Sequence, residues 1–341
     1  MGEEERKTMQ FPTLIVSDLH LTDNPGHEYR WGLFPWLHER LKEEKVKTLL
    51  ILGDMCDQKD HHSAELVNRM AKEMNALRKM VPRIVILMGN HDFLKAGHMY
   101  FKFLEMLPGV EVITKPMEDP DLNGPLTFYL PYSKNPARDW AGFDFSHYAY
   151  LFMHQTVKGA ISSNGQAMEG EELPALNAGK VYSGDIHVPQ IIGSVEYAGS
   201  PYHVHFGDKF KPRCILLDHG GKAIDLHFKT ISRVTVKVKS LAALKRLDFK
   251  PLDQVKLRIE LSEADKHDWS KIKRDGVAWL KEQGAVVQGV ELIVVKSTRR
   301  LLTGSNADVL ACSPSDTVTR FVELEELGGE ALDIALDLIG G

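Results

Sequence analysis

Short apolar runs recur along the first 230 residues, and each is followed at once by polar or ionisable residues. Four of them have the length of a buried strand and lie at residues 13–17, 48–52, 84–88 and 148–153. Between the second and third runs, Leu66, Met70 and Leu77 share one face of a helix from about residue 63 to residue 80. Strands that alternate with amphipathic helices predict an α/β fold built in layers.

Two further segments belong to this first domain. Phe34, Leu37 and Leu41 have the spacing of a second amphipathic helix. Loop-forming residues are concentrated after residue 115, so residues 114–140 are predicted to form an irregular crossing over the surface. We expect the first domain to span residues 1–231.

The pattern changes after about residue 232. Apolar and polar residues alternate over 234–238 and 255–261, which indicates half-buried strands. A predicted helix at about residues 267–283 separates them from the apolar run 290–295. Residues 232–298 therefore predict a second, smaller α/β domain.

Residues 299–341 form an acidic C-terminal tail. From Leu301 onward eight residues are acidic and one is basic, whereas the whole chain has a formal net charge of −5, so the remaining body is mildly basic. Two short amphipathic stretches, after Pro314 and after Gly329, predict two helices. Two such helices could form a hairpin that docks on a partner. Packing of the two helices on the rest of this chain would explain the pattern equally well.

The composition is that of a globular protein, since 43% of the 341 residues are hydrophobic and 26% are charged. No apolar run approaches the roughly 18 residues that a membrane span needs, and residues 1–9 are charged with no apolar stretch behind them. Cys56, Cys214 and Cys312 lie far apart, which argues against a disulfide framework and a thiolate zinc site. We therefore expect a cytoplasmic protein with no membrane partner.

Side chains that can bind metal follow the predicted strands. In chain order they are Asp18 and His20, Asp54 and Asp57, Asn90, His91 and Asp92, then His154, and finally Asp185 and His187. Because an open α/β sheet places its site at the carboxyl ends of its strands, these side chains are predicted to converge in one crevice. The tetrapeptide GNHD alone is a moderately specific sign of a functional site. The stronger evidence is that all these motifs occur in order, each at the end of a predicted strand.

Carboxylate, imidazole and amide ligands without thiolates suit divalent ions such as manganese, iron or zinc. So many ligands require two ions. A carboxylate shared by two ions about 3.5–4 Å apart can place a water that loses its proton at neutral pH and attacks phosphorus. Two cations also neutralise charge at phosphorus and at the leaving oxygen. These residues thus predict the hydrolysis of phosphate esters.

In these motifs the chain resembles the calcineurin-like metallophosphoesterase superfamily over about residues 12–220. The resemblance implies a layered β-sandwich flanked by helices. It also implies the metal ligands: Asp18, His20 and His187 for the first ion, Asp54 as the bridge, and Asn90, His154 and Asp185 for the second. His91 would be the catalytic histidine at the leaving group, Asp92 would fix its orientation, and Asp57 would support the ligands.

One position departs from the superfamily pattern, which has histidine where this chain has Asp185. Our hypothesis is that Asp185 binds metal and, as a third carboxylate, favours harder ions such as manganese or magnesium. The rival interpretation is a half-filled second site. His203 and His205 lie just downstream on one face of a predicted strand and could substitute, although a structural role is more common for such histidines.

Residues 181–206 resemble one particular group within this superfamily. The run GDIHVPQ, from Gly184 to Gln190, followed by YAGSP, from Tyr197 to Pro201, is similar to the SbcD-type nuclease subunit of double-strand-break repair. That resemblance implies manganese-dependent exonuclease action from 3′ ends of duplex DNA and endonuclease action on single strands. It also implies a capping domain, a tail that docks on an SbcC-type coiled-coil ATPase, and it is compatible with a homodimer.

Two other functions fit the same motifs. A phosphatase or nucleotide phosphodiesterase could use the same metal centre, and a scaffold that binds metal without catalysis is a third interpretation. The sequence contains no P-loop, so any dependence on ATP must come from another subunit. Lys59, His61 and His62, together with Arg299 and Arg300, are candidates for contact with the DNA backbone or are equally a solvated surface.

Overall fold

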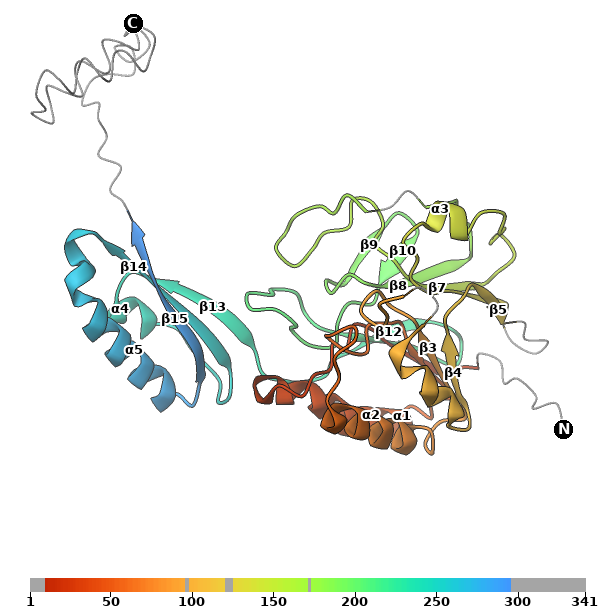
Figure 1. Cartoon of the computed structure of the whole chain (residues 1–341), viewed down its shortest axis with the longest axis horizontal. Helices are drawn as coiled ribbons and strands as arrows, with labels where there is room; N and C mark the ends of the chain where they lie inside the picture. The colour runs from red at the N-terminus through yellow and green to blue at the C-terminus, as the bar shows by residue number, and fades with distance from the viewer. Residues whose placement is uncertain (1–9, 96–97, 120–124, 171–172, 296–341) are drawn as a thin grey trace, which may run out of the picture.

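The computed structural model describes residues 10–95, 98–119, 125–170 and 173–295. Within these ranges, two six-stranded sheets form one body and a three-stranded sheet forms another (Figure 1). The layered α/β fold predicted from the sequence is confirmed. The predicted acidic tail, with Arg299, Arg300 and Cys312, lies outside the described residues. No helix in the described ranges combines the length and apolar character that crossing a membrane requires.

The first sheet contains the first three predicted strands. Its spatial order is β12 (Ala223–Leu226), β11 (Cys214–Leu217), β1 (Thr13–Val16), β2 (Thr48–Ile51), β3 (Arg83–Leu87) and β4 (Val110–Ile113). Strands β1 to β4 run parallel, whereas β11 is antiparallel to β1. Because parallel strands end at one edge, the loops that follow β1, β2 and β3 lie side by side.

The second sheet contains the fourth predicted strand. Its spatial order is β5 (Met117–Asp119), β6 (Thr127–Leu130), β7 (Tyr150–His154), β8 (Lys180–Gly184), β10 (Val195–Tyr197) and β9 (Gln190–Ile192). Strands β6, β7, β8 and β10 run parallel, and the two edge strands β5 and β9 run antiparallel to their neighbours.

The prediction of an irregular crossing over residues 114–140 is wrong. Strands β5 and β6 lie there, and so does the short helix α3 (Pro136–Asp139). Pro125 and Pro131 flank β6 closely, and all four residues of β6 are buried, so the segment shows loop signals without the alternation of a half-exposed strand.

The first sheet has a core layer on each of its two faces because successive residues of a strand point to opposite sides. Ile15 of β1 packs between the two sheets with Leu50 of β2 and Phe152 of β7. Its neighbours Leu14 and Val16 belong to the other layer, beneath the helices.

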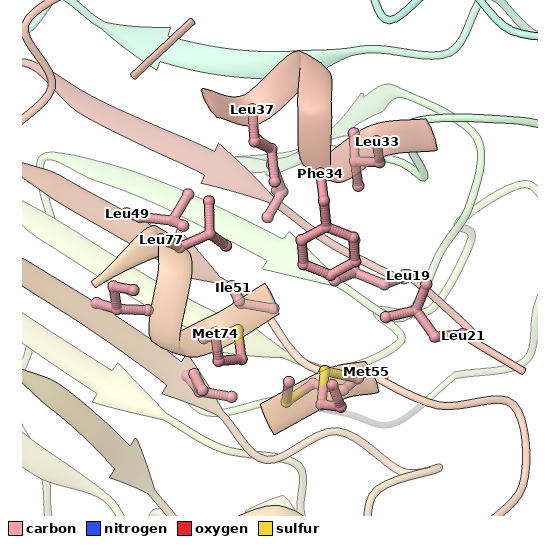
Figure 2. Close-up of a cluster of buried hydrophobic side chains, with 14 of the residues drawn as sticks. Leu19, Leu21, Leu33, Phe34, Leu37, Leu49, Ile51, Met55, Met74 and Leu77 are labelled. Carbon is pink, nitrogen blue, oxygen red and sulfur yellow. The ribbon is translucent and has the colours of Figure 1, made fainter. Parts of the chain in front are cut away.

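Two helices cover that outer face of the first sheet. Helices α1 (Leu33–Glu43) and α2 (Ala64–Leu77) present the apolar stripes expected from the sequence. Figure 2 shows them packed on the sheet, with Phe34, Leu37, Met74 and Leu77 near Leu49 and Ile51. The 3₁₀ segments η1 (Pro25–Gly32) and η2 (Tyr100–Met106) complete this body.

The three-stranded body contains the strands and the helix expected after residue 232. Its elements are β13 (Arg233–Val238), α4 (Leu241–Leu244), β14 (Gln254–Ser262), η3 (Ala264–Asp268), α5 (Trp269–Glu282) and β15 (Val286–Val295). All three strands are parallel, and α5 lies along one face of their sheet (Figure 1). Leu244, Leu257 and Leu280 belong to a hydrophobic cluster within this body, separate from the core of the two larger sheets.

Hydrogen bonds join the two bodies. The Arg233 guanidinium donates to the carbonyl of Val204, and the Gln254 amide donates to the carbonyl of Gly26. The Lys256 ammonium lies 4.6 Å from the centre of the Phe206 ring. Val204 and Phe206, which make two of these three contacts, follow the motif region of the first body.

Candidate metal centre

The predicted ligands lie in one cluster at the carboxyl ends of the strands. Atoms that can bind metal lie within 4.8 Å of one another in three overlapping groups, which are Asp18 with His20 and His187, His20 with Asp54 and His91, and Asp18 with Asp54 and His154. Asn90 and Asp185 join them, because Asn90 Nδ2 lies 3.2 Å from Asp185 Oδ1. The structure therefore brings together all the side chains that the sequence singled out as ligands.

Backbone strain is concentrated at these residues. Among the described residues, six that are not glycine have a positive φ, and four of the six are Asp18 (54°), His20 (42°), Asp54 (53°) and Asp185 (81°). Such conformations cost about 1–3 kcal/mol each and persist where the surrounding structure imposes them. The loops thus hold the candidate ligands in place at a cost in stability, which is typical of functional sites.

Two glycines of the motifs allow the loops to approach closely. A Cβ on Gly89 would lie 2.3 Å from Asp54 Oδ1, and one on Gly184 would lie 2.3 Å from the carbonyl oxygen of Leu52. Neither space accommodates a side chain. The glycine before Asn90 and the glycine before Asp185 are therefore required by packing within the cluster.

The first half of the cluster contains two facing imidazoles. His20 Nε2 lies 3.0 Å from His187 Nε2 and 3.5 Å from Asp54 Oδ2. Burial lowers the pKa of His20 to about 4, and burial followed by the proximity of His20 lowers the pKa of His187 strongly. Both rings are therefore neutral near pH 7, the form in which imidazole binds metal.

The second half of the cluster contains two buried atoms without a partner. His154 Nδ1 lies 2.6 Å from the carbonyl oxygen of Leu52, which can only accept, so Nδ1 donates and Nε2 carries the lone pair. Nε2 has no hydrogen-bond partner and lies 3.5 Å from Asp54 Oδ1. The Oδ1 atom of Asn90 is likewise buried and unpaired. Unpaired acceptor atoms beside carboxylates are suited to bind a cation.

The carboxylates of the cluster repel one another. Burial raises the pKa of Asp18 to about 7, with nearby Asp54 and Asp185 contributing in the same direction. Burial and then the proximity of Asp92 raise the pKa of Asp54. Buried like charges need compensation by positive charge. Together with the neutral imidazoles and unpaired acceptors, this donor set fits two divalent cations.

Asp185 occupies the place beside Asn90 and His154. Its Oδ1 lies 3.7 Å from His154 Nε2, and its Oδ2 accepts a hydrogen bond from the Thr156 hydroxyl. Its backbone N–H donates to Asp18 Oδ1 at 3.1 Å. A second-site ligand at this position stays a prediction, and Thr156, which sequence reasoning missed, fixes one of its oxygens.

The two downstream histidines differ in position. His205 stacks on His187 with 5.3 Å between ring centres, whereas His203 Nε2 bonds the carbonyl of Phe210 at 2.9 Å. Neither belongs to the groups of potential metal ligands found among the described residues. His203 is therefore engaged away from the cluster, and only His205 lies close to it.

The His91 ring is held by Asp57. His91 Nδ1 lies 2.7 Å from the backbone carbonyl of Asp57, so Nδ1 donates this bond and Nε2 is the nitrogen not used in it. The Asp57 carboxylate lies 3.5 Å from His20 Nδ1 and 3.7 Å from Arg30 Nη1, and its interaction with His20 lowers the pKa of Asp57. Arg30 is buried here without a motif in the sequence that marks it.

Asp92 acts on the loops rather than on the His91 ring. Its carboxylate accepts hydrogen bonds from the backbone N–H groups of Gly89 (2.7 Å), Asp54 (2.8 Å) and Met55 (2.9 Å). The expectation that Asp92 fixes the ring of His91 therefore needs correction, because the Asp57 carbonyl holds the ring and Asp92 ties two metal-binding loops together.

The candidate DNA contacts differ in exposure. Lys59 and His61 are exposed, whereas the His62 ring packs 4.1 Å from the Tyr100 ring and 5.0 Å from the Phe101 ring, measured between centres. Contact of these residues with DNA stays a prediction.

A layered α/β body with this donor set at the strand ends is typical of a metal-dependent hydrolase of phosphate esters. The family model described as calcineurin-like phosphoesterase matches residues 11–189, more than half of the sequence. The chain belongs to the calcineurin-like phosphoesterase family and is a metal-dependent phosphoesterase.

Two solved structures are similar to this chain. The Pseudomonas putida nuclease MPE is 15% identical, with a TM-score of 0.30, over 63% of this chain and 87% of that protein. The phosphoesterase YfcE from E. coli is 13% identical, with a TM-score of 0.30, over 64% of this chain and 99% of that protein. No curated protein matches the chain.

Proposed function

We propose that this protein is an SbcD-type DNA nuclease that hydrolyses phosphodiesters with two divalent ions, most readily manganese. The observation that carries the hydrolytic part is the convergence of the candidate ligands with two unpaired buried acceptors, His154 Nε2 and Asn90 Oδ1. The motif region 184–201 and the separate body after residue 232 support DNA as the substrate, because the resemblance to SbcD-type nucleases rests on them.

The residues of the cluster would have separate roles in binding the two ions and in assisting the leaving group. Asp18, His20 and His187 would hold one ion, Asn90, His154 and Asp185 the other, and Asp54 would lie between them. Bound ions supply an activated water and neutralise the charge of the phosphate. His91, with Nδ1 anchored to the Asp57 carbonyl, would present Nε2 to the leaving oxygen and, as an imidazolium with a proton on both nitrogens, would stabilise or protonate it.

Cleavage assays test this proposal. The full chain is incubated with Mn²⁺ and either linear duplex DNA, single-stranded circular DNA or bis-p-nitrophenyl phosphate, with His91→Asn as the matched inactive control. We expect cleavage of all three by the natural chain and strong loss in the variant. Cleavage of only the small ester would identify a small-molecule phosphodiesterase instead. Binding of manganese with every ester left intact, even in the presence of the ATPase, would identify a scaffold.

The partner is a further part of the proposal. We propose that the acidic tail 299–341 docks on the coiled coil of an SbcC-type ATPase in the cytoplasm, with a homodimer as the working assembly. A chain truncated after residue 298 should keep its hydrolysis of bis-p-nitrophenyl phosphate and lose stimulation by the ATPase. Equal stimulation of both chains would contradict the docking role.

A further inference from the structure

Residues 157–170 form a hairpin beside the metal centre. The N–H of Met168 donates to the carbonyl of Ala160 at 2.7 Å, and the N–H of Gly159 donates to the carbonyl of Met168 at 3.0 Å. Gly170 has a φ of 52°, and a Cβ there would lie 2.4 Å from the backbone nitrogen of Lys158. The two arms of the hairpin therefore approach so closely that only glycine fits at its end.

Two residues of the motif region hold this hairpin. The Gln190 side chain makes two bonds with the backbone of Ile161, accepting from its N–H at 2.8 Å and donating to its carbonyl at 2.7 Å. The Tyr197 hydroxyl accepts from the N–H of Val157 at 2.7 Å and donates to the carbonyl of Gln155 at 3.0 Å. Neither Gln190 nor Tyr197 is part of the metal cluster, so the metal chemistry leaves them unexplained.

A cavity of about 500 Å³ lies between the hairpin and the metal centre. Asn90, Asp185 and His187 line one side, and Ser163, Met168 and Glu169 line the other. Binding sites for small molecules have volumes of about 300–1,000 Å³. The cavity is therefore large enough for one organic group attached to a phosphate at the metal centre.

The charge of the cavity indicates what this group is. No lysine or arginine occurs among the described residues that line it, and Glu169 adds a carboxylate on the hairpin side. A second phosphate would meet no cation there and would be repelled by Glu169. Met168, a residue that is 38% exposed, and Tyr132 offer apolar surface, and Ser163 offers a hydroxyl. An uncharged group with a flat apolar face and polar edges matches this lining.

We propose that the cavity under the 157–170 hairpin binds the nucleoside next to the scissile phosphate, and that Gln190 is the positioning residue that holds the hairpin over it. This inference rests on the proposed function, because it names the part of the substrate that the phosphoesterase centre recognises. The hairpin confers preference for nucleoside esters over other phosphodiesters.

Two esters separate this role from the chemistry. Thymidine 5′-(p-nitrophenyl phosphate) carries a nucleoside, and methyl p-nitrophenyl phosphate does not, while both release the same leaving group. Gln190→Ala and Met168→Ala are compared with Ile191→Ala, an exposed neighbour of Gln190 in β9 that does not line the cavity. We expect KM for the thymidine ester to rise about three- to tenfold in the first two variants, with kcat and both constants for the methyl ester unchanged. Ile191→Ala should match the natural chain.

Binding without turnover gives a second readout. Calorimetry with Mn²⁺ should show that the natural chain binds thymidine 5′-monophosphate more tightly than inorganic phosphate, and that Gln190→Ala loses most of this difference. Equal binding of the two by the natural chain, or equal changes with both esters in the variants, would overturn the inference. If the natural chain prefers the thymidine ester but leaves DNA intact, the nuclease proposal fails and the nucleoside cavity stands. If DNA is cleaved but the two esters are hydrolysed equally well, the nuclease proposal stands and the nucleoside cavity fails.

Discussion

His154 donates its Nδ1 proton to the carbonyl of Leu52 at 2.6 Å, and this bond leaves its unpaired Nε2 facing the carboxylate of Asp54. The acceptor is the residue that follows β2 and immediately precedes the motif glycine, so one bond links strand β7 of the second sheet to the metal-binding loop of the first. The two sheets of the sandwich thereby build the centre jointly.

Replacement of His154 should remove one ion and leave the other. In His154→Gln we expect the manganese content of the protein to fall from two ions to one per chain, because Asp18, His20 and His187 remain. Metal analysis after equilibrium dialysis measures it. His147→Gln, at a histidine whose side chain is 61% exposed, is the matched control and should keep two ions. Two ions in His154→Gln would show that this ring is structural.

Asp185 should set the preference among metals. Asp185→His lowers the number of carboxylates in the cluster from three to two, so we expect weaker binding of Mn²⁺ and Mg²⁺ relative to Zn²⁺. Thr156→Val, which removes the hydroxyl bonded to Asp185 Oδ2, should weaken Mn²⁺ binding in the same direction but less. Competitive titration with a metal indicator checks both. Unchanged affinity and preference in both variants would exclude Asp185 as a ligand.

Gly184 should tolerate no side chain. A Cβ there would lie 2.3 Å from the Leu52 carbonyl and 2.3 Å from Ser17 Oγ, so we expect Gly184→Ala to lower the free energy of unfolding by about 1–3 kcal/mol or more. The control is Gly289→Ala, where nothing lies within 4 Å of the added carbon. Chemical denaturation of the metal-free proteins measures both. A loss no greater than that of the control would mean that the loops shift freely.

Acid should weaken the contact between the two bodies through His27. Arg233 Nη2 lies 3.3 Å from His27 Nε2, and because arginine always donates, His27 must accept in its neutral form. Burial, together with Arg30 and Arg233, lowers the pKa of His27 to about 4, and Asp57 opposes this shift. The unfolded chain has the ordinary pKa of about 6.5, so the contribution to stability is complete above pH 6.5 and is lost as the pH falls toward 4.

Denaturant unfolding at pH 7 and at pH 5 tests this. His27→Gln keeps an acceptor for Arg233 and cannot titrate, so the variant should lose less stability on acidification than the natural chain. His147→Gln should lose as much as the natural chain. Identical losses in His27→Gln and the natural chain would show that this histidine does not govern the contact.

The sequence predicted the cluster because its residues follow strand ends. Asp18, Asp54 and Asn90 lie two or three residues beyond the ends of parallel neighbours in the first sheet, and His154 and Asp185 lie at the ends of neighbouring parallel strands in the second. Parallel pairing makes the order along the chain a sufficient guide to proximity. A glycine precedes Asp54, Asn90 and Asp185. At each of these glycines a Cβ would collide with a neighbouring part of the cluster.

Other parts of the site could not be predicted in this way. Arg30 and Thr156 reach the cluster from a 3₁₀ segment and a loop without a periodic pattern, and the contact of Asp57 with His91 is made by a backbone carbonyl that any residue could offer. The hairpin 157–170 is held by side chains about 30 to 40 residues distant. Such contacts depend on the packing of loops, which residue type and spacing do not encode.

Anomalous diffraction from crystals soaked in Mn²⁺ tests the central claim most directly. Two peaks should appear in the cluster, one beside Asp18, His20 and His187 and one beside Asn90, His154 and Asp185, with Asp54 in contact with both. No peak at saturating Mn²⁺, or a single peak with Asn90 and Asp185 still bonded to each other, would contradict a two-ion phosphoesterase centre.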